Sequence, residues 1–287
     1  MPSYRQNLQL YGRMGITMGG LVLVYLIFLW VLSMYVPSVF ALSLIALVLL
    51  TIQYFYSDKL ALRSADARIV DENEYPKLHS VVTRLSIQSA VPKPQVAVSS
   101  ANMSNAFATG RNQQNSVVCV TEELIRELND EELEAVIAHE LSHIKNRDVA
   151  VMTIASFFST IAFFIVRFGM YGNTRNGRLL IAVFASFVVW VVSTLLLRTL
   201  SRYREYSADR GAASITGNPM ALSSALKKIT GINDTKPQED MRKHDGMNAF
   251  YISSINSGRL SELISTHPNP EKRIEKLETL AKEQYTE

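Results

Sequence analysis

The chain of 287 residues carries 29 basic and 26 acidic side chains, which gives a net charge of +3, and a single cysteine, Cys119. The small net charge gives no reason to expect nucleic acid as a partner. One cysteine excludes an intrachain disulfide, so nothing argues for an oxidising compartment. The charges are spread very unevenly, because residues 14–56, 149–166 and 179–197 contain no Asp, Glu, Lys or Arg. This pattern excludes a wholly soluble or disordered chain and predicts an integral membrane protein.

Four stretches are apolar enough to cross a hydrocarbon core of about 30 Å, which takes about 20 helical residues. The first uncharged run is long enough for two crossings, and Pro37 divides it because proline disfavours helix for the residue before it. The predicted transmembrane helices are residues 14–36, 39–56, 149–168 and 179–200. For the last two, the alternative is a hairpin buried in a large soluble core, because apolar runs near 18 residues lie at the limit of detection.

Lysine and arginine near the helix ends predict the orientation in the membrane. Basic side chains precede the first predicted helix and follow the second and the fourth, whereas the 167–178 loop also carries three arginines and disagrees with this bias. The prediction is a multi-pass protein of the cell (inner) membrane, if the source is a bacterium. Residues 1–13, 57–148 and 201–287 then lie in the cytoplasm.

The two long polar segments are expected to form one mainly helical domain with a small sheet. The predicted elements are a helix over Glu74–Ser89, strands over Gln95–Ser99 and Ser116–Val120 with a turn-rich Ser104–Gly110 between them, and helices from Glu122, over Asn129–Asn146, Ser201–Thr216, Pro219–Ile229 and Pro270–Lys282. Asn129 followed by Glu132 is typical of a capping box at a helix start. His79 is expected to be exposed on its helix, and Cys119 to pack inside its strand.

The segment His139-Glu140-Leu141-Ser142-His143 indicates a metal site. On a helix, residues four apart lie about 40° apart, so both imidazoles face one point. Two such rings suit one Zn²⁺, and the intervening Glu140 can accept a proton from a water that the metal polarises. The alternative is a pair of solvated histidines on a surface helix. A catalytic zinc site usually has three protein ligands and one open position, so a third ligand is expected elsewhere.

Glu205 and Asp209 share a helix face and are the candidates for that third position. One carboxylate can bind the metal, and the other can hold the distal nitrogen of a ligand histidine. His143 lies just before the third apolar segment and Glu205 just after the fourth, so a membrane hairpin would bring the two side by side at the membrane surface. The alternative is an exposed, charged helix.

Three segments, H-E-L-S-H-I-K-N-R-D, R-E-Y-S-A-D-R and S-T-H-P-N-P-E-K-R-I, resemble the motifs of the HtpX membrane zinc metalloproteases. These are heat-shock and quality-control proteases related to the CaaX prenyl-protein endoproteases. The resemblance covers nearly the whole chain and departs from the family at Asn269, where many relatives carry a proline. It implies a mainly α integral membrane protein with four transmembrane helices and a zincin-type, gluzincin-like α+β protease domain with a small sheet.

The resemblance also implies roles for individual positions of the metal site. It implies one Zn²⁺ per chain, bound by His139, His143 and Glu205, with Glu140 as general base and acid. It further implies that His267 contacts the tetrahedral intermediate.

Other positions gain supporting roles from the same resemblance. Asp209 is implied to support the metal site and Arg273 to form an internal ion pair. Asn105, Ala106 and Phe107 are implied to lie beside the backbone of a bound substrate.

These expectations describe a zinc endopeptidase that cleaves misfolded or damaged membrane proteins at the cytoplasmic face, in quality control and stress response. A substrate is expected to add as an extended strand to a free sheet edge, for which Ser116–Val120 is the candidate. One alternative is a narrow processing protease of the CaaX type, although that branch has more membrane helices. Another is a non-catalytic zinc-binding chaperone or scaffold, although a structural zinc usually needs cysteines, and Cys119 is not suitably placed. A third alternative is a metal transporter, which would need ionisable residues within the apolar spans. The uncharged cores of the four predicted spans count against it.

Overall fold

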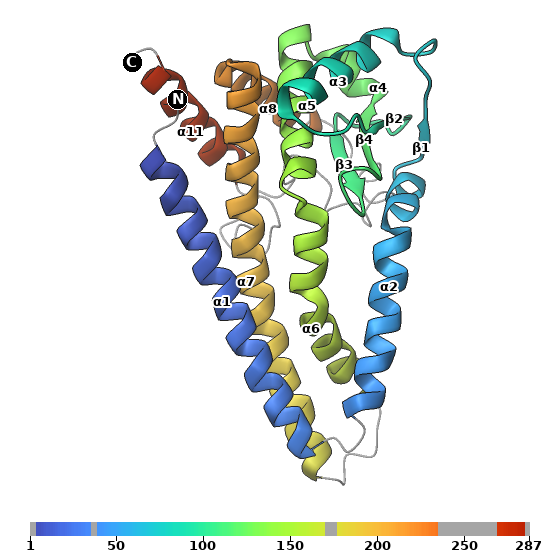
Figure 1. Ribbon diagram of the computed structural model, residues 1–287, viewed down its shortest axis with the longest axis vertical. Helices are drawn as coiled ribbons and strands as arrows, with labels where there is room; N and C mark the ends of the chain where they lie inside the picture. The colour runs from blue at the N-terminus through green and yellow to red at the C-terminus, as the bar shows by residue number, and fades with distance from the viewer. Residues whose placement is uncertain (1–3, 36–38, 170–176, 235–268, 285–287) are drawn as a thin grey trace.

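The computed structural model describes residues 4–35, 39–169, 177–234 and 269–284. Long apolar helices form one end of the molecule, and a helical domain with a four-stranded sheet forms the other (Figure 1). The long helices are α1 (Tyr4–Tyr35), α2 (Val39–Ser64), α6 (Asp148–Gly169) and α7 (Gly177–Thr216). α1 and α6 both pack along α7 around an apolar cluster that includes Leu21, Phe28, Ala162 and Leu200.

Three of these helices are long and apolar enough to cross a membrane, within Leu8–Met34, Asp148–Arg167 and Leu180–Thr216. Large apolar side chains such as Trp30 and Phe184 lie exposed on them, which is expected of a surface that faces lipid. α2 contains the remaining predicted crossing, but several of its side chains lie outside the described residues, so the predicted count of four is not confirmed. The helices extend beyond the predicted crossings, and where each one enters lipid remains a prediction.

The sheet has the strand order β1-β2-β4-β3, with β2 parallel to β4 and the two outer strands antiparallel to their neighbours. Its strands are β1 (Ala67–Ile69), β2 (Gln95–Ser99), β3 (Ala106–Gly110) and β4 (Ser116–Thr121). Two predictions were wrong. Residues 106–110 form a strand, because pairing with β4 over their whole length outweighs their turn-forming composition. Ser116–Val120 is not a free edge, because β4 lies between two strands and is buried along its whole length.

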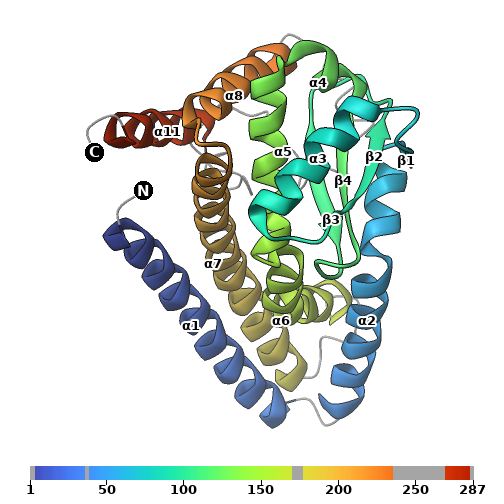
Figure 2. The same ribbon diagram turned by 45° about the horizontal axis from the view of Figure 1, so that its top comes forward.

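The two faces of the sheet pack against different parts of the chain. Figure 2 shows α3 (Pro76–Ser89) and α5 (Asp130–Lys145) over one face, where Val118 and Val120 point. The opposite face holds Cys119 against the end of α2. As predicted, Cys119 is fully buried in its strand, and this burial raises the pKa of its thiol to about 12. Such a thiol is unreactive at neutral pH.

The predicted helices of the polar domain are confirmed. They are α3, α4 (Glu122–Glu127), α5, the end of α7, α8 (Pro219–Asp234) and α11 (Pro270–Gln284). The capping box is also confirmed, because Asn129 Oδ1 accepts from Glu132 N and Glu132 Oε2 accepts from Asn129 N, both at 2.9 Å. The prediction for His79 was wrong: only 8% of it is exposed, because α3 turns this residue toward Val70 O, 3.1 Å from its Nε2.

Candidate metal centre

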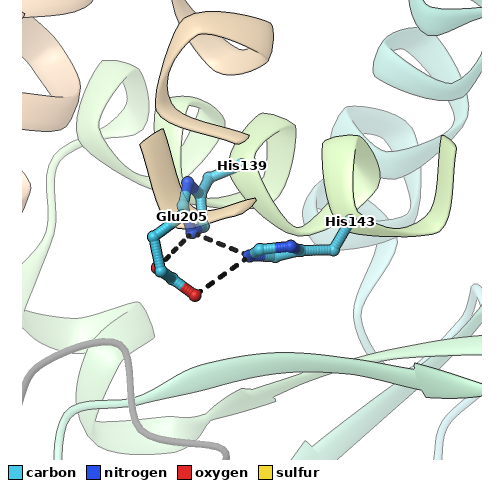
Figure 3. A group of neighbouring side chains, drawn as sticks. All are labelled: His139, His143 and Glu205. Carbon is cyan, nitrogen blue, oxygen red and sulfur yellow. Dashed lines mark hydrogen bonds and ion pairs between the residues drawn. The ribbon is translucent and has the colours of Figure 1, made fainter. Parts of the chain in front are cut away.

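Two helices bring three potential metal ligands together beside the sheet. His139 and His143 lie on α5, Glu205 lies on α7, and the three side chains converge on one point (Figure 3). The two Nε2 atoms are 3.2 Å apart, and the Glu205 oxygens lie 3.5 Å from the Nε2 of His139 and 3.6 Å from that of His143. One donor atom from each residue falls within 4.8 Å of the other two. Two imidazoles and a carboxylate are the donor set of several catalytic zinc sites, so these residues fit a divalent metal ion.

A close approach of α5 and α7 makes this convergence possible. A Cβ atom placed on Gly211 of α7 would lie 2.4 Å from Ser142 Oγ and 2.8 Å from Ser142 Cβ. Any larger residue at this position would therefore push the two helices apart. Glycine at position 211 lets α7 lie directly against the helix that carries both histidines.

The distal nitrogen of His139 is held by a buried carboxylate and a buried guanidinium. Asp209 Oδ1 lies 3.1 Å from His139 Nδ1. Arg273 of α11 binds Asp209 in a bidentate manner, with Nε donating to Oδ2 at 2.9 Å and Nη2 to Oδ1 at 2.6 Å. Arg273 Nη1 also lies 3.2 Å from Glu205 Oε2. We call His139, Asp209 and Arg273 the His139 support.

A second set of the same composition holds the distal nitrogen of His143, and the sequence analysis missed it. Asp148 Oδ2 lies 2.5 Å from His143 Nδ1, and Arg204 Nη2 lies 2.6 Å from Asp148 Oδ1. We call His143, Asp148 and Arg204 the His143 support. Two features of the sequence could have indicated this second set: the aspartate that ends H-E-L-S-H-I-K-N-R-D, and the arginine directly before Glu205.

The surroundings of the three ligands are negatively charged. Four buried carboxylates and two buried guanidiniums surround the histidines, an excess of two negative charges that suits a divalent cation: Glu140, Asp148, Glu205 and Asp209, with Arg204 and Arg273. Burial and Arg273 oppose protonation of His139, but its hydrogen bonds with Asp209 and Glu205 outweigh them and raise its pKa to about 9. Burial lowers the pKa of His143 to about 4.

The other predicted site residues occupy the surroundings of this centre. Glu140 is buried on α5 between the two histidines. Ala106 and Phe107 begin β3, and Asn105 precedes it, with its carbonyl accepting from Thr121 N at 3.0 Å. His267 lies outside the described residues.

A cavity beside the outer strand β3 reaches His143 of the metal centre. Its volume is about 210 Å³, and it is lined by Ala108 and Thr109 of β3 and by His143 and Asp148, among others. β3 is an outer strand of the sheet, so its second edge has no partner strand in the described part of the chain. Ala106 and Phe107, which are predicted to lie beside substrate, are therefore on the strand that borders this cavity.

The start of α11 shows how Asn269 fits where many relatives have proline. The Asn269 side chain accepts a hydrogen bond from Glu271 N at 2.9 Å, as helix-capping residues do. This cap holds the first turn of the helix that carries Arg273.

Comparison with known proteins places the chain among proteases. Residues 72–281 match the model of peptidase family M48. The chain is 51% identical to "Protease HtpX homolog 2" of Methanosarcina mazei over 288 residues, which covers 98% of each chain. It is 45% identical to "Protease HtpX homolog" of Moorella thermoacetica, with 96% of this chain and 95% of that one covered. The fold resembles the crystal structure of S. mikatae Ste24p, with a TM-score of 0.55, 17% identity, and coverage of 96% of this chain and 66% of that one.

Proposed function

The chain belongs to peptidase family M48 and is a membrane metalloprotease, and on this premise we propose that it is a zinc endopeptidase that cleaves misfolded or damaged membrane proteins at the cytoplasmic face. The observation that carries the proposal is the convergence of His139, His143 and Glu205 at one point, with Glu140, which lies between the two histidines in the sequence, buried on the same helix. A structural zinc site usually closes its fourth position with protein, most often with cysteine. Cys119 lies on the far face of the sheet, so it does not complete such a site.

The proposed roles follow from the positions of the side chains. His139, His143 and Glu205 would bind one Zn²⁺ per chain. When bound, the metal supplies Lewis acidity, which polarises the scissile carbonyl and acidifies water. Glu140 accepts the proton of the attacking water and passes it to the leaving amine. For His267 we propose the role that the family resemblance implies, donation to the developing oxyanion.

The proposed supporting residues act on the geometry of the ligands. Asp209 fixes the ring of His139 through Nδ1, and Arg273 holds the Asp209 carboxylate with two hydrogen bonds. A ligand histidine whose other nitrogen is bound to a carboxylate keeps its tautomer and orientation and becomes more basic. This arrangement prepares the site before the metal binds.

Substrate is proposed to bind along β3 instead of β4. An extended peptide can pair with the outer edge of β3 through main-chain hydrogen bonds, beside Asn105, Ala106 and Phe107. The cavity that borders Ala108 and Thr109 extends to His143, so a peptide on this edge would pass the metal centre. Main-chain pairing reads little sequence, which suits an enzyme that removes many different damaged proteins in a stress response.

The membrane position of the centre supports the choice of substrate. α7 continues without interruption from its apolar part to Glu205, so the ligand lies close to the place where the helix leaves the apolar region. We propose four crossings within the cell (inner) membrane, with both termini and the protease domain in the cytoplasm. Membrane proteins with unfolded cytoplasmic segments would then be the accessible substrates.

Glu140→Gln tests the proposal. The amide keeps the shape of the side chain but cannot accept the proton, and loss of a general base typically costs about 10²–10⁴-fold in rate. We expect cleavage of an unfolded membrane-protein substrate in detergent to be lost, while zinc per chain, measured by elemental analysis, is unchanged. Glu134→Gln is the matched control, because Glu134 lies on the same helix and pairs with Arg84 instead. A Glu140→Gln protein that cleaves at the wild-type rate would refute the assignment.

A further inference from the structure

We propose that Asp148 is a positioning residue for His143, clamped by Arg204, so that helices α6 and α7 set the orientation of this ring. The inference rests on the proposed zinc site and adds residues to it. Asp148 is the first residue of α6, Arg204 belongs to α7, and His143 lies in the last turn of α5. Three separate helices therefore meet at one carboxylate.

The geometry fixes which nitrogen of His143 faces the other ligands. A neutral imidazole has one donor nitrogen and one acceptor nitrogen. Asp148 Oδ2, 2.5 Å from Nδ1, is an acceptor, so Nδ1 carries the hydrogen and Nε2 keeps its lone pair. Nε2 is the atom that lies 3.2 Å from His139 Nε2 and 3.6 Å from Glu205 Oε1. Asp148 thereby directs the free lone pair of His143 to the place where the metal would bind.

Arg204 holds the Asp148 carboxylate in place. The two Asp148 oxygens have different partners: Oδ2 contacts His143, and Oδ1 contacts Arg204 Nη2 at 2.6 Å. Asp148 and Arg204 are 8% and 3% exposed, and a buried charge needs such a partner. Because Arg204 directly precedes Glu205, α7 supplies both the clamp for one ligand and the next ligand itself.

The connection between α5 and α6 is shaped for this contact. Arg147 adopts a left-handed conformation with φ of 55°, which L-residues rarely do. This short connection places the first residue of α6 against the ring of His143, five residues earlier. Strained backbone of this kind tends to persist where surrounding contacts hold it, often at functional sites.

A simpler explanation is that Asp148 only neutralises Arg204, and two variants separate the two roles. Asp148→Asn keeps the size of the side chain. Asp148→Leu with Arg204→Met removes both charges, and replacing a buried ion pair by apolar residues is often neutral or stabilising. If Asp148 positions His143, both variants should bind zinc about 10–100-fold more weakly than wild type, the range found when such supporting residues are lost. If it only pairs with Arg204, the double variant should bind zinc normally.

The measurement is the zinc dissociation constant of the full chain in detergent, from competition with a chromophoric chelator, beside the midpoint of thermal unfolding. The expected result for the double variant is a wild-type midpoint with weakened zinc binding. Glu132→Gln is the control, because it changes a buried carboxylate on α5, the helix of His143, that pairs with Lys228 and not with a histidine. The inference is overturned if the double variant binds zinc with wild-type affinity. If the double variant does not fold, wild-type zinc affinity in Asp148→Asn overturns it instead. Either result leaves the proposed zinc site intact. A wild-type chain that binds no zinc overturns the proposed function as well.

Discussion

The His139 support and the His143 support have the same composition, and both draw on α5 and α7, but a different third helix completes each one. In both, a carboxylate holds Nδ1 of the histidine and a guanidinium holds the carboxylate. The first is completed by Arg273 of the C-terminal helix α11. The second is completed by Asp148 and Arg204, at the start of α6 and within α7. The difference teaches that orienting a ligand ring requires a local arrangement of charges, to which α7 can contribute together with either α11 or α6.

Arg273→Met breaks the His139 support and should have the largest effect. It leaves Asp209 and Glu205 without their buried guanidinium, and removing one partner of a buried ion pair typically costs about 3–5 kcal/mol. We expect a strong fall in the midpoint of thermal unfolding, followed by intrinsic fluorescence in detergent. Lys276→Met on the same helix, where the exposed Lys276 lies over the Tyr206 ring, should change it little. Equal effects of the two substitutions would contradict a special role for Arg273.

Gly211→Ala acts on both supports at once, because it separates α5 from α7. The added methyl would meet Ser142, and overpacking of this kind typically costs about 1–3 kcal/mol. Zinc affinity should also fall, since Glu205 moves away from both histidines. In a Ser142→Gly background the same substitution should cost little, which a double-mutant cycle of unfolding free energies measures. An undiminished cost in that background would place the clash elsewhere.

Glu132→Gln changes neither support and should have the smallest effect. Burial raises the pKa of Glu132, but hydrogen bonds with Lys228, Ser224 and the Asn129 backbone outweigh it, so the net shift is downward. A lowered carboxyl pKa contributes stability that is present above the unfolded value of about 4.3 and is lost as the pH falls through the folded value. We expect wild type to exceed the variant by about 1 kcal/mol or less at pH 7, because Lys228 is half-exposed.

The measurement for Glu132 is chemical unfolding of both proteins between neutral and acidic pH. The difference in unfolding free energy should shrink as the pH falls below 4.3, the approximate pKa of an unfolded glutamate. A difference that is constant with pH would assign the effect to packing and not to charge.

The sequence predicts those parts of the site that follow from helical spacing. His139 and His143 face one point because they are four residues apart, and Glu205 and Asp209 share a face for the same reason. Spacing left open which of these carboxylates faces the metal position. The structure places Glu205 beside both Nε2 atoms and Asp209 beside Nδ1 of His139. That choice depends on the rotation of α7 against α5, which the contact at Gly211 sets.

The features that sequence reasoning missed depend on the path of the chain. The order of strands cannot be read from alternation within each strand, so β4 was expected at the edge that β3 occupies. Asp148 was missed because its contact with His143 requires the left-handed turn at Arg147, and an arginine does not predict this conformation. The predicted role of His267 remains a prediction, because that residue lies outside the described residues.

The unbroken course of α7 restricts which insertions and deletions this protein can accept during evolution. The helix has 40 residues, about 60 Å of continuous rod, and Glu205 lies within its last third. Inserting or deleting one residue ahead of Glu205 would turn everything beyond it by about 100° and shift it by about 1.5 Å. The carboxylate would then face another direction unless a bulge absorbed the change. The number of lipid-facing residues in this helix is therefore fixed by the chemistry at its far end, and not only by the thickness of the bilayer.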